Sequence, residues 1–270
     1  MRTISNLSEI LPSVDALLLD QFGVLHDGTR AFAGAIECVE ALQERGLPLV
    51  ALSNSGRRAK PNMDRLVRLG FPASAFKAMV TSGELTRHDL LKRLADGRLK
   101  PGNSILMLAR ENDASLLDGL GVKVAEPGEA VHLVIISGAE PETHSREDYK
   151  RLLSPLARAG VPAICANPDT SIYAGESASF GPGLLAEDYA AAGGTVDTFG
   201  KPGAAMFQAG LEALGKPDPG RCLMVGDSLH HDILGGQRAG CQSLLVTSGV
   251  QAGLAEDGVE PDYAMDRLRF

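Results

Sequence analysis

The stretch Leu17-Leu18-Leu19-Asp20-Gln21-Phe22-Gly23-Val24 decides the fold expected for this chain. It begins as a strand-sized apolar run and then reaches a carboxylate, and a glycine that helps the chain to turn follows. In an open parallel sheet, ligands bind outside the carboxyl ends of the strands. The stretch therefore predicts a buried strand that brings Asp20 to the edge of a candidate site.

Similar apolar runs recur along the whole chain, and longer amphipathic stretches separate them. Residues 35–42 and 204–214 space their apolar residues at three and four, as helices packed on a sheet do. This alternation is typical of βαβ units and predicts an α/β fold with a Rossmann-like, doubly wound parallel sheet. The strand-like runs cover residues 14–19, 48–52, 77–80, 104–108, 133–136, 162–165, 222–225 and 243–246.

Composition indicates an ordinary globular chain. Its 270 residues are 44% hydrophobic and 22% charged, which is enough chain for one large or two modest domains. The net charge of −8 does not favour nucleic acid as the main partner. Neither a secretory pattern nor an apolar run of membrane-spanning length is present, so we expect a cytoplasmic protein without a membrane segment. The four cysteines form no C-x-x-C pair, and we expect buried free thiols.

Four polar positions stand out because each follows a strand-like run or precedes a helical one: Asp20, Ser53, Lys201 and Asp227. Each alone has an ordinary interpretation, as a turn former, a helix N-cap, a solvated cation or the first residue of a loop. Together with Asp232 they supply a nucleophilic carboxylate, a hydroxyl donor, a fixed cation and two further carboxylates. These are the groups that Mg²⁺-assisted phosphoryl transfer requires.

The order and context of these positions resemble the four motifs of the haloacid-dehalogenase-like (HAD) superfamily. Three further stretches resemble its class IIA branch, the NagD-like and nitrophenylphosphatase-like hydrolases: residues 81–84 (TSGE), 166–169 (ANPD) and 181–183 (GPG). The motifs fall before about residue 60 and after about residue 195. The resemblance therefore implies a core domain of residues 1–82 and 181–270, with an inserted α/β cap domain of residues 83–180.

The resemblance also implies roles for individual residues. Asp20 would attack phosphorus and become an aspartyl phosphate, and Mg²⁺ would bind to Asp20, to Asp227 and to the backbone carbonyl of Phe22. Asp232 and Ser228 would support this site. The implied phosphate-binding residues are Phe22, Gly23, Ser53, Asn54 and Lys201, and the implied hinge or substrate-facing residues are Asn167 and Asp169.

One residue departs from the family pattern. The position two residues after the nucleophile is usually a second Asp, which protonates the leaving group, and here it is Phe22. General acid–base help is worth about 10²–10⁴-fold, or about 3–5 kcal/mol for a poor leaving group. We therefore expect a phosphatase of a small phosphorylated metabolite that is weak or restricted to good leaving groups, or that borrows a proton from His26 or Asp27.

Two alternatives use the same fold. One is a catalytically impaired regulatory protein that binds phosphate and Mg²⁺, which the absence of an acid at Phe22 favours. The other is a haloacid dehalogenase proper, in which Asp20 would attack carbon; the pair Asp227 and Asp232 disfavours it. Class IIA relatives often pair through their caps, so a homodimer is also an expectation from the resemblance.

Weaker signals have ordinary interpretations. Residues 210–216 match the first part of a P-loop but read better as a helix that ends at Gly215, because Pro217 replaces the Ser or Thr that would hold a metal. Arg57, Arg58 and Lys60 could steer an anion, or form a solvated first helical turn. His230 and His231 read as surface residues.

Overall fold

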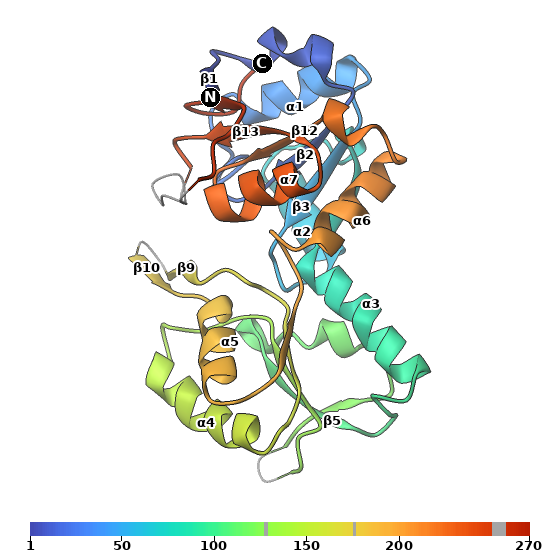
Figure 1. The fold of residues 1–270 in the computed structure, drawn as a ribbon, viewed down its shortest axis with the longest axis vertical. Helices are drawn as coiled ribbons and strands as arrows, with labels where there is room; N and C mark the ends of the chain where they lie inside the picture. The colour runs from blue at the N-terminus through green and yellow to red at the C-terminus, as the bar shows by residue number, and fades with distance from the viewer. Residues whose placement is uncertain (127–128, 175–176, 250–257) are drawn as a thin grey trace. The chain divides into compact units, whose positions relative to one another are not determined.

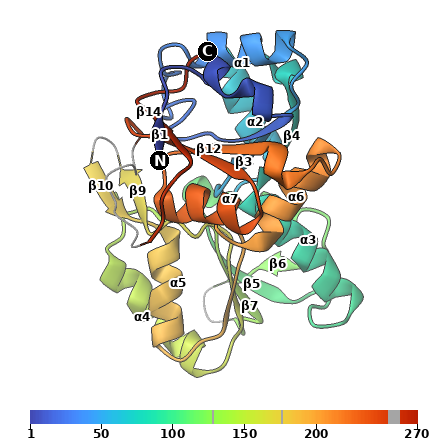
Figure 2. The same ribbon diagram turned by 45° about the horizontal axis from the view of Figure 1, so that its top comes forward.

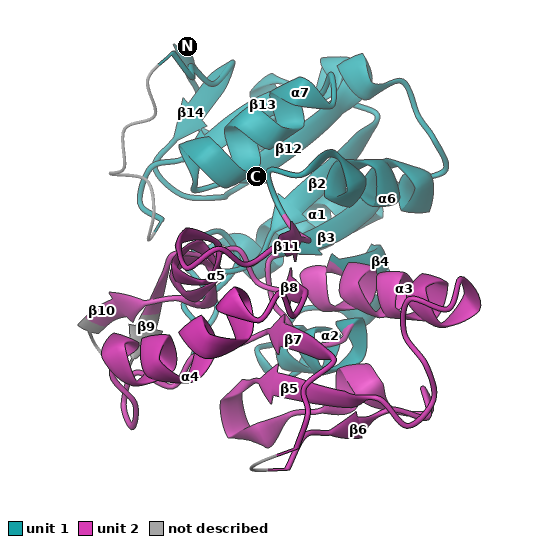
Figure 3. Ribbon diagram, turned by 60° about the horizontal axis from the view of Figure 1, so that its bottom comes forward, with its two compact units in different colours: residues 1–53, 59–80, 201–270 teal, residues 54–58, 81–200 magenta. Residues whose placement is uncertain are grey.

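A computed structural model describes residues 1–126, 129–174, 177–249 and 258–270. In it, the chain forms two compact units (Figure 3). Unit 1 comprises residues 1–53, 59–80 and 201–270, and unit 2 comprises residues 54–58 and 81–200. Along the sequence, the segments of unit 2 thus lie between segments of unit 1. Relative to the boundaries expected from the sequence, residues 54–58, 81–82 and 181–200 group with unit 2.

Seven strands of the described residues form the sheet of unit 1. β2 pairs in parallel with both β3 and β12, and β12 also pairs in parallel with β13. All five residues of β2 are buried, as expected for a strand that is covered on both faces. In sheet order the strands are β1 (Arg2–Thr3), β14 (Tyr263–Met265), β13 (Gln242–Val246), β12 (Cys222–Gly226), β2 (Ala16–Asp20), β3 (Leu49–Ser53) and β4 (Phe76–Thr81).

Helices cover both faces of this sheet (Figures 1 and 2). On one face, α1 (Ala35–Glu44) and α2 (Ala59–Arg68) bury apolar side chains against Leu17 and Leu19 of β2. On the other, α6 (Ala204–Leu214) packs so closely that a Cβ at Gly210 would lie 3.0 Å from Leu18. Alternate residues of one strand thus point to opposite helical layers.

Shorter helical segments complete unit 1. Residues 229–234 form a π-helix, η7 (Leu229–Leu234), which leads into α7 (Gly235–Arg238). The 3₁₀ turns are η1 (Leu7–Glu9), η2 (Leu11–Ser13), η3 (Ala73–Ala75) and η6 (Pro219–Arg221). α6 ends at Gly215, which adopts a left-handed φ of 98°, so the P-loop-like residues 210–216 are a helix end, as expected.

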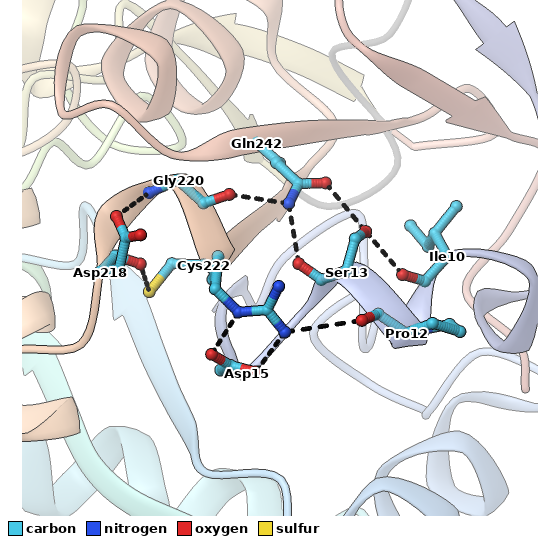
Figure 4. A network of polar contacts seen from close by, with 9 residues as sticks. Ile10, Pro12, Ser13, Asp15, Asp218, Gly220, Cys222 and Gln242 are labelled. Carbon is cyan, nitrogen blue, oxygen red and sulfur yellow. Dashed lines mark hydrogen bonds and ion pairs between the residues drawn. The ribbon is translucent and has the colours of Figure 1, made fainter.

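The start of β12 is bound to the segment before β2 by polar contacts (Figure 4). Nε2 of Gln242 donates to the backbone oxygens of Ser13 at 3.0 Å and Gly220 at 2.9 Å. Arg221 forms a forked ion pair with Asp15, with one N···O distance of 2.7 Å. Since Gln242 is the first residue of β13, these contacts hold together the amino-terminal ends of the neighbouring strands β2, β12 and β13.

Unit 2 has its own parallel sheet. Its strands in sheet order are β11 (Val196–Thr198), β8 (Ala163–Cys165), β7 (Leu133–Ile136), β5 (Ser104–Leu108) and β6 (Lys123–Val124). A separate antiparallel hairpin consists of β9 (Ser171–Ala174) and β10 (Ser177–Phe180). In the five-stranded sheet, β5 lies between β6, which follows it in the sequence, and β7.

Helices again cover both faces of this sheet. α4 (Arg146–Arg158) and α5 (Pro182–Ala191) share a core with Val134 and Ile136 of β7. α3 (Ser82–Ala95) contributes Leu90 to a second core with Leu133 and Ile135. The short turns η4 (Arg110–Asn112) and η5 (Ser115–Leu117) follow β5.

The architecture confirms the expected fold class. Each of the eight strand-like runs of the sequence overlaps a strand of one of the two parallel sheets, and helices lie on both faces of each sheet. All four cysteines are buried and reduced. Within the described part of the chain, we find no helix with the length and apolar character needed to cross a membrane.

Candidate active site

The order of strands in unit 1 brings two carboxylates together. The chain runs from β2 to β3 and β4 on one side, and returns to β12 and β13 on the other side of β2. The carboxyl ends of β2 and β12 therefore meet where the connections diverge, which is where open α/β sheets bind ligands. Asp20 is the last residue of β2, and Asp227 is the first residue after β12.

Lys201 lies at the centre of the charged groups. Its Nζ is 2.7 Å from Oδ1 of Asp20 and 2.7 Å from Oδ1 of Asp232. The Lys201 side chain is 3% exposed and that of Asp232 is 1% exposed, so both charges are removed from water. The structure thus brings together three of the residues that the sequence singled out, although 181 positions separate Asp20 from Lys201.

Asp227 completes a cluster of three carboxylates. One oxygen from each of Asp20, Asp227 and Asp232 lies within 4.8 Å of the other two. Asp232 belongs to η7, and its Oδ2 accepts a hydrogen bond of 3.1 Å from the backbone N–H of Ser228. Its two oxygens therefore have partners, whereas the cluster as a whole has more carboxylates than cations.

Glycines allow the backbone to approach these carboxylates. A Cβ at Gly23 would lie 2.0 Å from Oδ2 of Asp227, and a Cβ at Gly249 would lie 2.2 Å from Cβ of the same residue. A Cβ at Gly226 would lie 2.1 Å from Cβ of Asp232. Sequence reasoning missed Gly249; the signal for it is its place just after the apolar run of β13.

Burial and charge shift the titration of this cluster. Burial raises the pKa of Asp20 well above its ordinary value, Lys201 opposes this rise, and the carboxylates of Asp232 and Asp227 add to it. Burial alone would lower the pKa of Lys201, but the attraction of Asp20 and Asp232 outweighs it and leaves the pKa above its ordinary value. Three carboxyl groups thus share one ammonium in this cluster.

The loop after Asp20 places an aromatic pair where the family pattern has an acid. The Phe22 side chain is 37% exposed, and its ring meets the ring of His26 edge to face, with centroids 6.0 Å apart. His26 is 2% exposed, and its Nδ1 accepts a hydrogen bond of 2.9 Å from the N–H of Gly28. Its Nε2 has no hydrogen-bond partner among the described residues.

Neither residue named as a substitute acid is in the state of a proton donor at neutral pH. Burial, with a smaller effect from Arg65, lowers the pKa of His26 to about 4, so the imidazole is neutral. Oδ1 of Asp27 accepts hydrogen bonds from the backbone and side chain of Thr29 and from the N–H of Arg30. These bonds hold the pKa of Asp27 well below its ordinary value, so it is an ionised turn former.

Ser53 and Ser228 come from the same edge of the sheet. Ser53 is the last residue of β3, one position beyond the residue that is paired with Asp20. Ser228 caps η7, because its Oγ accepts a hydrogen bond of 3.1 Å from the N–H of His231. The rings of His230 and His231 lie edge to face, with centroids 5.2 Å apart, and both residues retain exposed surface.

Comparison with known proteins identifies the family of the chain. A model described as haloacid dehalogenase-like hydrolase matches residues 17–123, and a HAD-hydrolase-like model matches residues 198–269. Chronophin of Mus musculus is 31% identical over 252 residues, which cover 91% of this chain and 85% of the relative. The chain belongs to the haloacid dehalogenase-like hydrolases. The 5'-nucleotidase YutF of Bacillus subtilis is 28% identical, with 93% of this chain and 94% of the relative covered.

Solved structures of HAD-like hydrolases have the same fold. A haloacid dehalogenase-like hydrolase from Brucella suis 1330 has a TM-score of 0.87 at 28% identity, covering 98% of this chain and 99% of the other. NagD of E. coli K-12 has a TM-score of 0.68 at 23% identity, covering 94% and 96%, and shares the fold. The expected membership of the NagD-like class IIA branch is confirmed.

The remaining predicted site residues of this HAD-like hydrolase lie together in unit 2. Nδ2 of Asn54 donates to Oδ1 of Asp169 at 2.8 Å, and the N–H of Asp169 donates to Oδ1 of Asn167 at 3.0 Å. Gly181 and Gly183 pack on this turn, since a Cβ at either would lie within 2.2 Å of its backbone. The stretches ANPD and GPG therefore pack together, and Asn54, 115 positions before Asp169, is bonded to them.

Proposed function

We propose that this HAD-like hydrolase is a Mg²⁺-dependent phosphatase of a small phosphorylated metabolite, with Asp20 as the nucleophile. The observation that carries the proposal is the buried contact of Lys201 with both Asp20 and Asp232, with Asp227 alongside. A carboxylate that must approach a phosphate dianion needs its own charge offset, and the fixed ammonium of Lys201 supplies that offset.

The charge count of the site favours a divalent cation. Three carboxylates share one ammonium in a buried cluster, and oxygen ligands of this kind suit Mg²⁺. We assign the metal to Asp20, Asp227 and the backbone carbonyl of Phe22, with Asp232 and Ser228 in support. When bound, Mg²⁺ would neutralise charge on the phosphoryl group.

The side chains of the site then account for two half-reactions. In the first, a carboxylate oxygen of Asp20 forms a bond to phosphorus, and the ester P–O bond breaks with its electron pair leaving on the departing oxygen. In the second, water attacks the phosphorus of the aspartyl phosphate, which releases inorganic phosphate and restores the carboxylate. We assign Ser53, Asn54, Lys201 and the N–H of Phe22 to the phosphoryl oxygens. The N–H of Gly23, which the family resemblance also implies, donates at 3.0 Å to the carbonyl oxygen of His26 in this structure.

The leaving group receives little help from this chain. Phe22 carries no proton to donate, His26 is neutral and buried, and Asp27 is held ionised in a turn. The departing oxygen must then leave as an anion or take its proton from water. The proposal is therefore an enzyme whose rate depends steeply on the acidity of the leaving group, so that activated phosphoesters or acyl phosphates are preferred.

Relatives indicate the class of substrate to test. They include a D-glycerol 3-phosphate phosphatase of Mycobacterium tuberculosis, an acid sugar phosphatase of Staphylococcus aureus and the 5'-nucleotidase YutF. A panel of glycerol, sugar and nucleoside phosphates covers this range. We propose the hinge or substrate-facing role that the family resemblance implies for Asn167 and Asp169.

Phe22 also supports a second candidate, a regulatory protein that binds phosphate and Mg²⁺ without turnover. Release of nitrophenol from nitrophenyl phosphate, measured with and without Mg²⁺, separates the two. Metal-dependent release that is lost in Asp20→Asn supports the enzyme. Vanadate binding without release supports the regulatory protein, and release of chloride from chloroacetate would support a dehalogenase.

A series of substituted phenyl phosphates tests the missing acid. For the wild type, we expect kcat/KM to fall steeply as the pKa of the leaving phenol rises. Phe22→Asp should flatten this dependence and speed the poorest leaving groups by about 10²-fold or more, the lower range for general acid catalysis. Phe22→Leu is the matched control, since it shortens the side chain without adding a proton. Equal slopes in all three proteins would contradict the proposal.

A further inference from the structure

Unit 2 contains a cavity of about 180 Å³ that the proposed reaction does not use. Met107, Leu108 and Ala109, at the end of β5, form one side of it together with Asn112. The opposite side consists of residues that follow β7 or belong to α4: Glu140, His144, Asp148, Tyr149 and Leu152. All of these residues belong to unit 2, whereas Asp20, Asp227 and Lys201 belong to unit 1.

The topology of the second sheet explains why a cavity forms there. From β5 the chain moves to β6 on one side, and it then returns to the other side of β5 as β7. The connections that leave the carboxyl ends of β5 and β7 therefore diverge, and such switch points are the ligand-binding positions of open parallel sheets. The same relationship in unit 1 brings Asp20 and Asp227 together.

Backbone contacts join the segments that follow β5 and β7. The N–H groups of Ser137 and Gly138 both donate to the carbonyl of Leu108, at 2.9 and 3.0 Å. A Cβ at Gly138 would lie 2.7 Å from the backbone nitrogen of Arg110, so only glycine fits there. In the segment that follows β5, Glu111 and Asn112 adopt left-handed φ values of 56° and 53°, which are strained for residues with a side chain.

The lining combines apolar surface with negative charge. Met107, Leu108 and Leu152 are apolar, and Leu152 remains 47% exposed. Glu140 and Asp148 are the ionisable acids of the wall, and neither Lys nor Arg is among the described residues that line it. The cavity thus favours a ligand that has both an apolar body and a positive charge.

The two carboxylates differ in what they can still accept. Asp148 completes the capping box of α4, whose N-cap is Ser145: its Oδ2 accepts from the N–H and Oγ of Ser145, and its Oδ1 pairs with Arg151. Oε1 of Glu140 accepts a hydrogen bond of 2.9 Å from the N–H of Glu111. Among the described residues Oε2 of Glu140 has no hydrogen-bond partner in the structure, so it can receive a ligand N–H.

Tyr149 places an aromatic ring next to this acceptor. Its hydroxyl oxygen accepts a hydrogen bond of 3.0 Å from the backbone N–H of Glu140, and its ring lies 5.8 Å from that of His144, measured between centroids. Burial raises the pKa of Tyr149; the hydrogen bond from the backbone of Glu140 and the charge of Arg110 oppose this rise, and the carboxylates of Glu140 and Glu142 add to it. An ammonium group beside an aromatic ring and a carboxylate is stabilised by both.

We propose that this cavity is a second ligand site, which binds a small primary ammonium compound with an apolar or aromatic body. The ammonium group donates to Oε2 of Glu140, and the body packs on Met107, Leu108 and Leu152. The size fits this class, because an apolar cavity of about 150 Å³ holds benzene. The site goes beyond the proposed phosphatase activity and does not depend on it.

Calorimetric titration of the full chain with phenethylammonium at neutral pH tests the site, in buffer that contains Mg²⁺. We expect saturable binding of one equivalent. The neutral isostere 2-phenylethanol should bind at least about tenfold more weakly, and Glu140→Gln should lose about tenfold in affinity, because a hydrogen bond to a charged group is removed. Gln keeps an acceptor for the N–H of Glu111, so the fold is expected to persist, and an unchanged melting temperature checks this.

Glu147→Gln is the matched control. It makes the same change of charge on the exposed surface of α4, outside the cavity, and should leave the affinity unchanged. In amide NMR spectra, the ligand should shift signals of residues 107–112 and 140–152. No saturable binding, equal binding of the alcohol, or equal affinity of Glu140→Gln would overturn the proposal. Shifts confined to unit 1 would also overturn it, since the carboxylates of Asp20 and Asp227 would then be the acceptors.

Discussion

A Cβ atom at Gly23 would lie 2.0 Å from Oδ2 of Asp227, so the turn after β2 and the carboxylate after β12 pack directly on each other. Gly23 also has a φ of 88°, in the region that glycine adopts without strain. The backbone that follows Asp20 is therefore held at a fixed position relative to Asp227. We expect this contact to affect phosphatase activity more than the free energy of unfolding.

Gly23→Ala should lower metal-dependent phosphatase activity by about 10²-fold or more, because the added methyl group displaces the Asp227 carboxylate. It should also reduce the free energy of unfolding by about 1–2 kcal/mol, since a left-handed φ is strained for alanine. Gly28→Ala is the control: its φ is 98°, but its Cβ would meet the Phe22 ring at 3.2 Å rather than a carboxylate. Equal loss of activity in both variants would contradict the role of the Gly23 contact.

Lys201→Met should be the most damaging single change at the site. It leaves Asp20 and Asp232 buried without their cation, which is expected to cost about 3–5 kcal/mol of unfolding free energy. Phosphatase activity should fall by about 10²-fold or more. Urea denaturation and steady-state kinetics measure the two effects. Lys216→Met removes an exposed ion pair with Glu212 and should cost less than about 1 kcal/mol; a comparable loss there would refute the account.

The contribution of His26 to the stability of the protein should fall as pH decreases from about 6.5 to about 4. His26 is buried and neutral, with a pKa of about 4, whereas an unfolded histidine has a pKa near 6.5. The unfolded state therefore binds more protons in this window, and stability rises with pH across it, by about 3 kcal/mol in all. In His26→Asn this contribution should vanish from the pH profile of unfolding free energy. His144→Asn, at an exposed site, should keep the wild-type profile.

Removal of divalent metal should lower the melting temperature. Mg²⁺ at about 100 times its Kd stabilises the folded state by about 2.7 kcal/mol, which corresponds to several degrees for a chain of this size. Scanning calorimetry with Mg²⁺ and with EDTA measures the shift. Asp227→Asn should abolish it, and Asp64→Asn, which removes a surface carboxylate paired with Lys60, should preserve it. A shift of the same size in Asp227→Asn would place the metal elsewhere.

Much of the fold is readable from local sequence. The runs that end at Asp20, Ser53 and Asp227 have the length and apolar character of buried strands, so each polar residue is expected at a strand end. Edge strands are different. β6 and β11 have two and three residues and expose polar side chains, so they carry no periodic signal. The π-helix after Ser228 likewise has no local signature.

By itself, the sequence determined which residues lie at the ends of buried strands, because burial and alternation are recorded locally in the order of apolar and polar residues. Only the tertiary structure decided which of those ends meet. The contact between Lys201 and Asp20, the packing of Gly249 on Asp227, the burial of His26 and the cavity beside Glu140 all join segments that are brought together by strand order and helix packing. The free energy of those contacts is shared among many distant residues, so no local pattern encodes it.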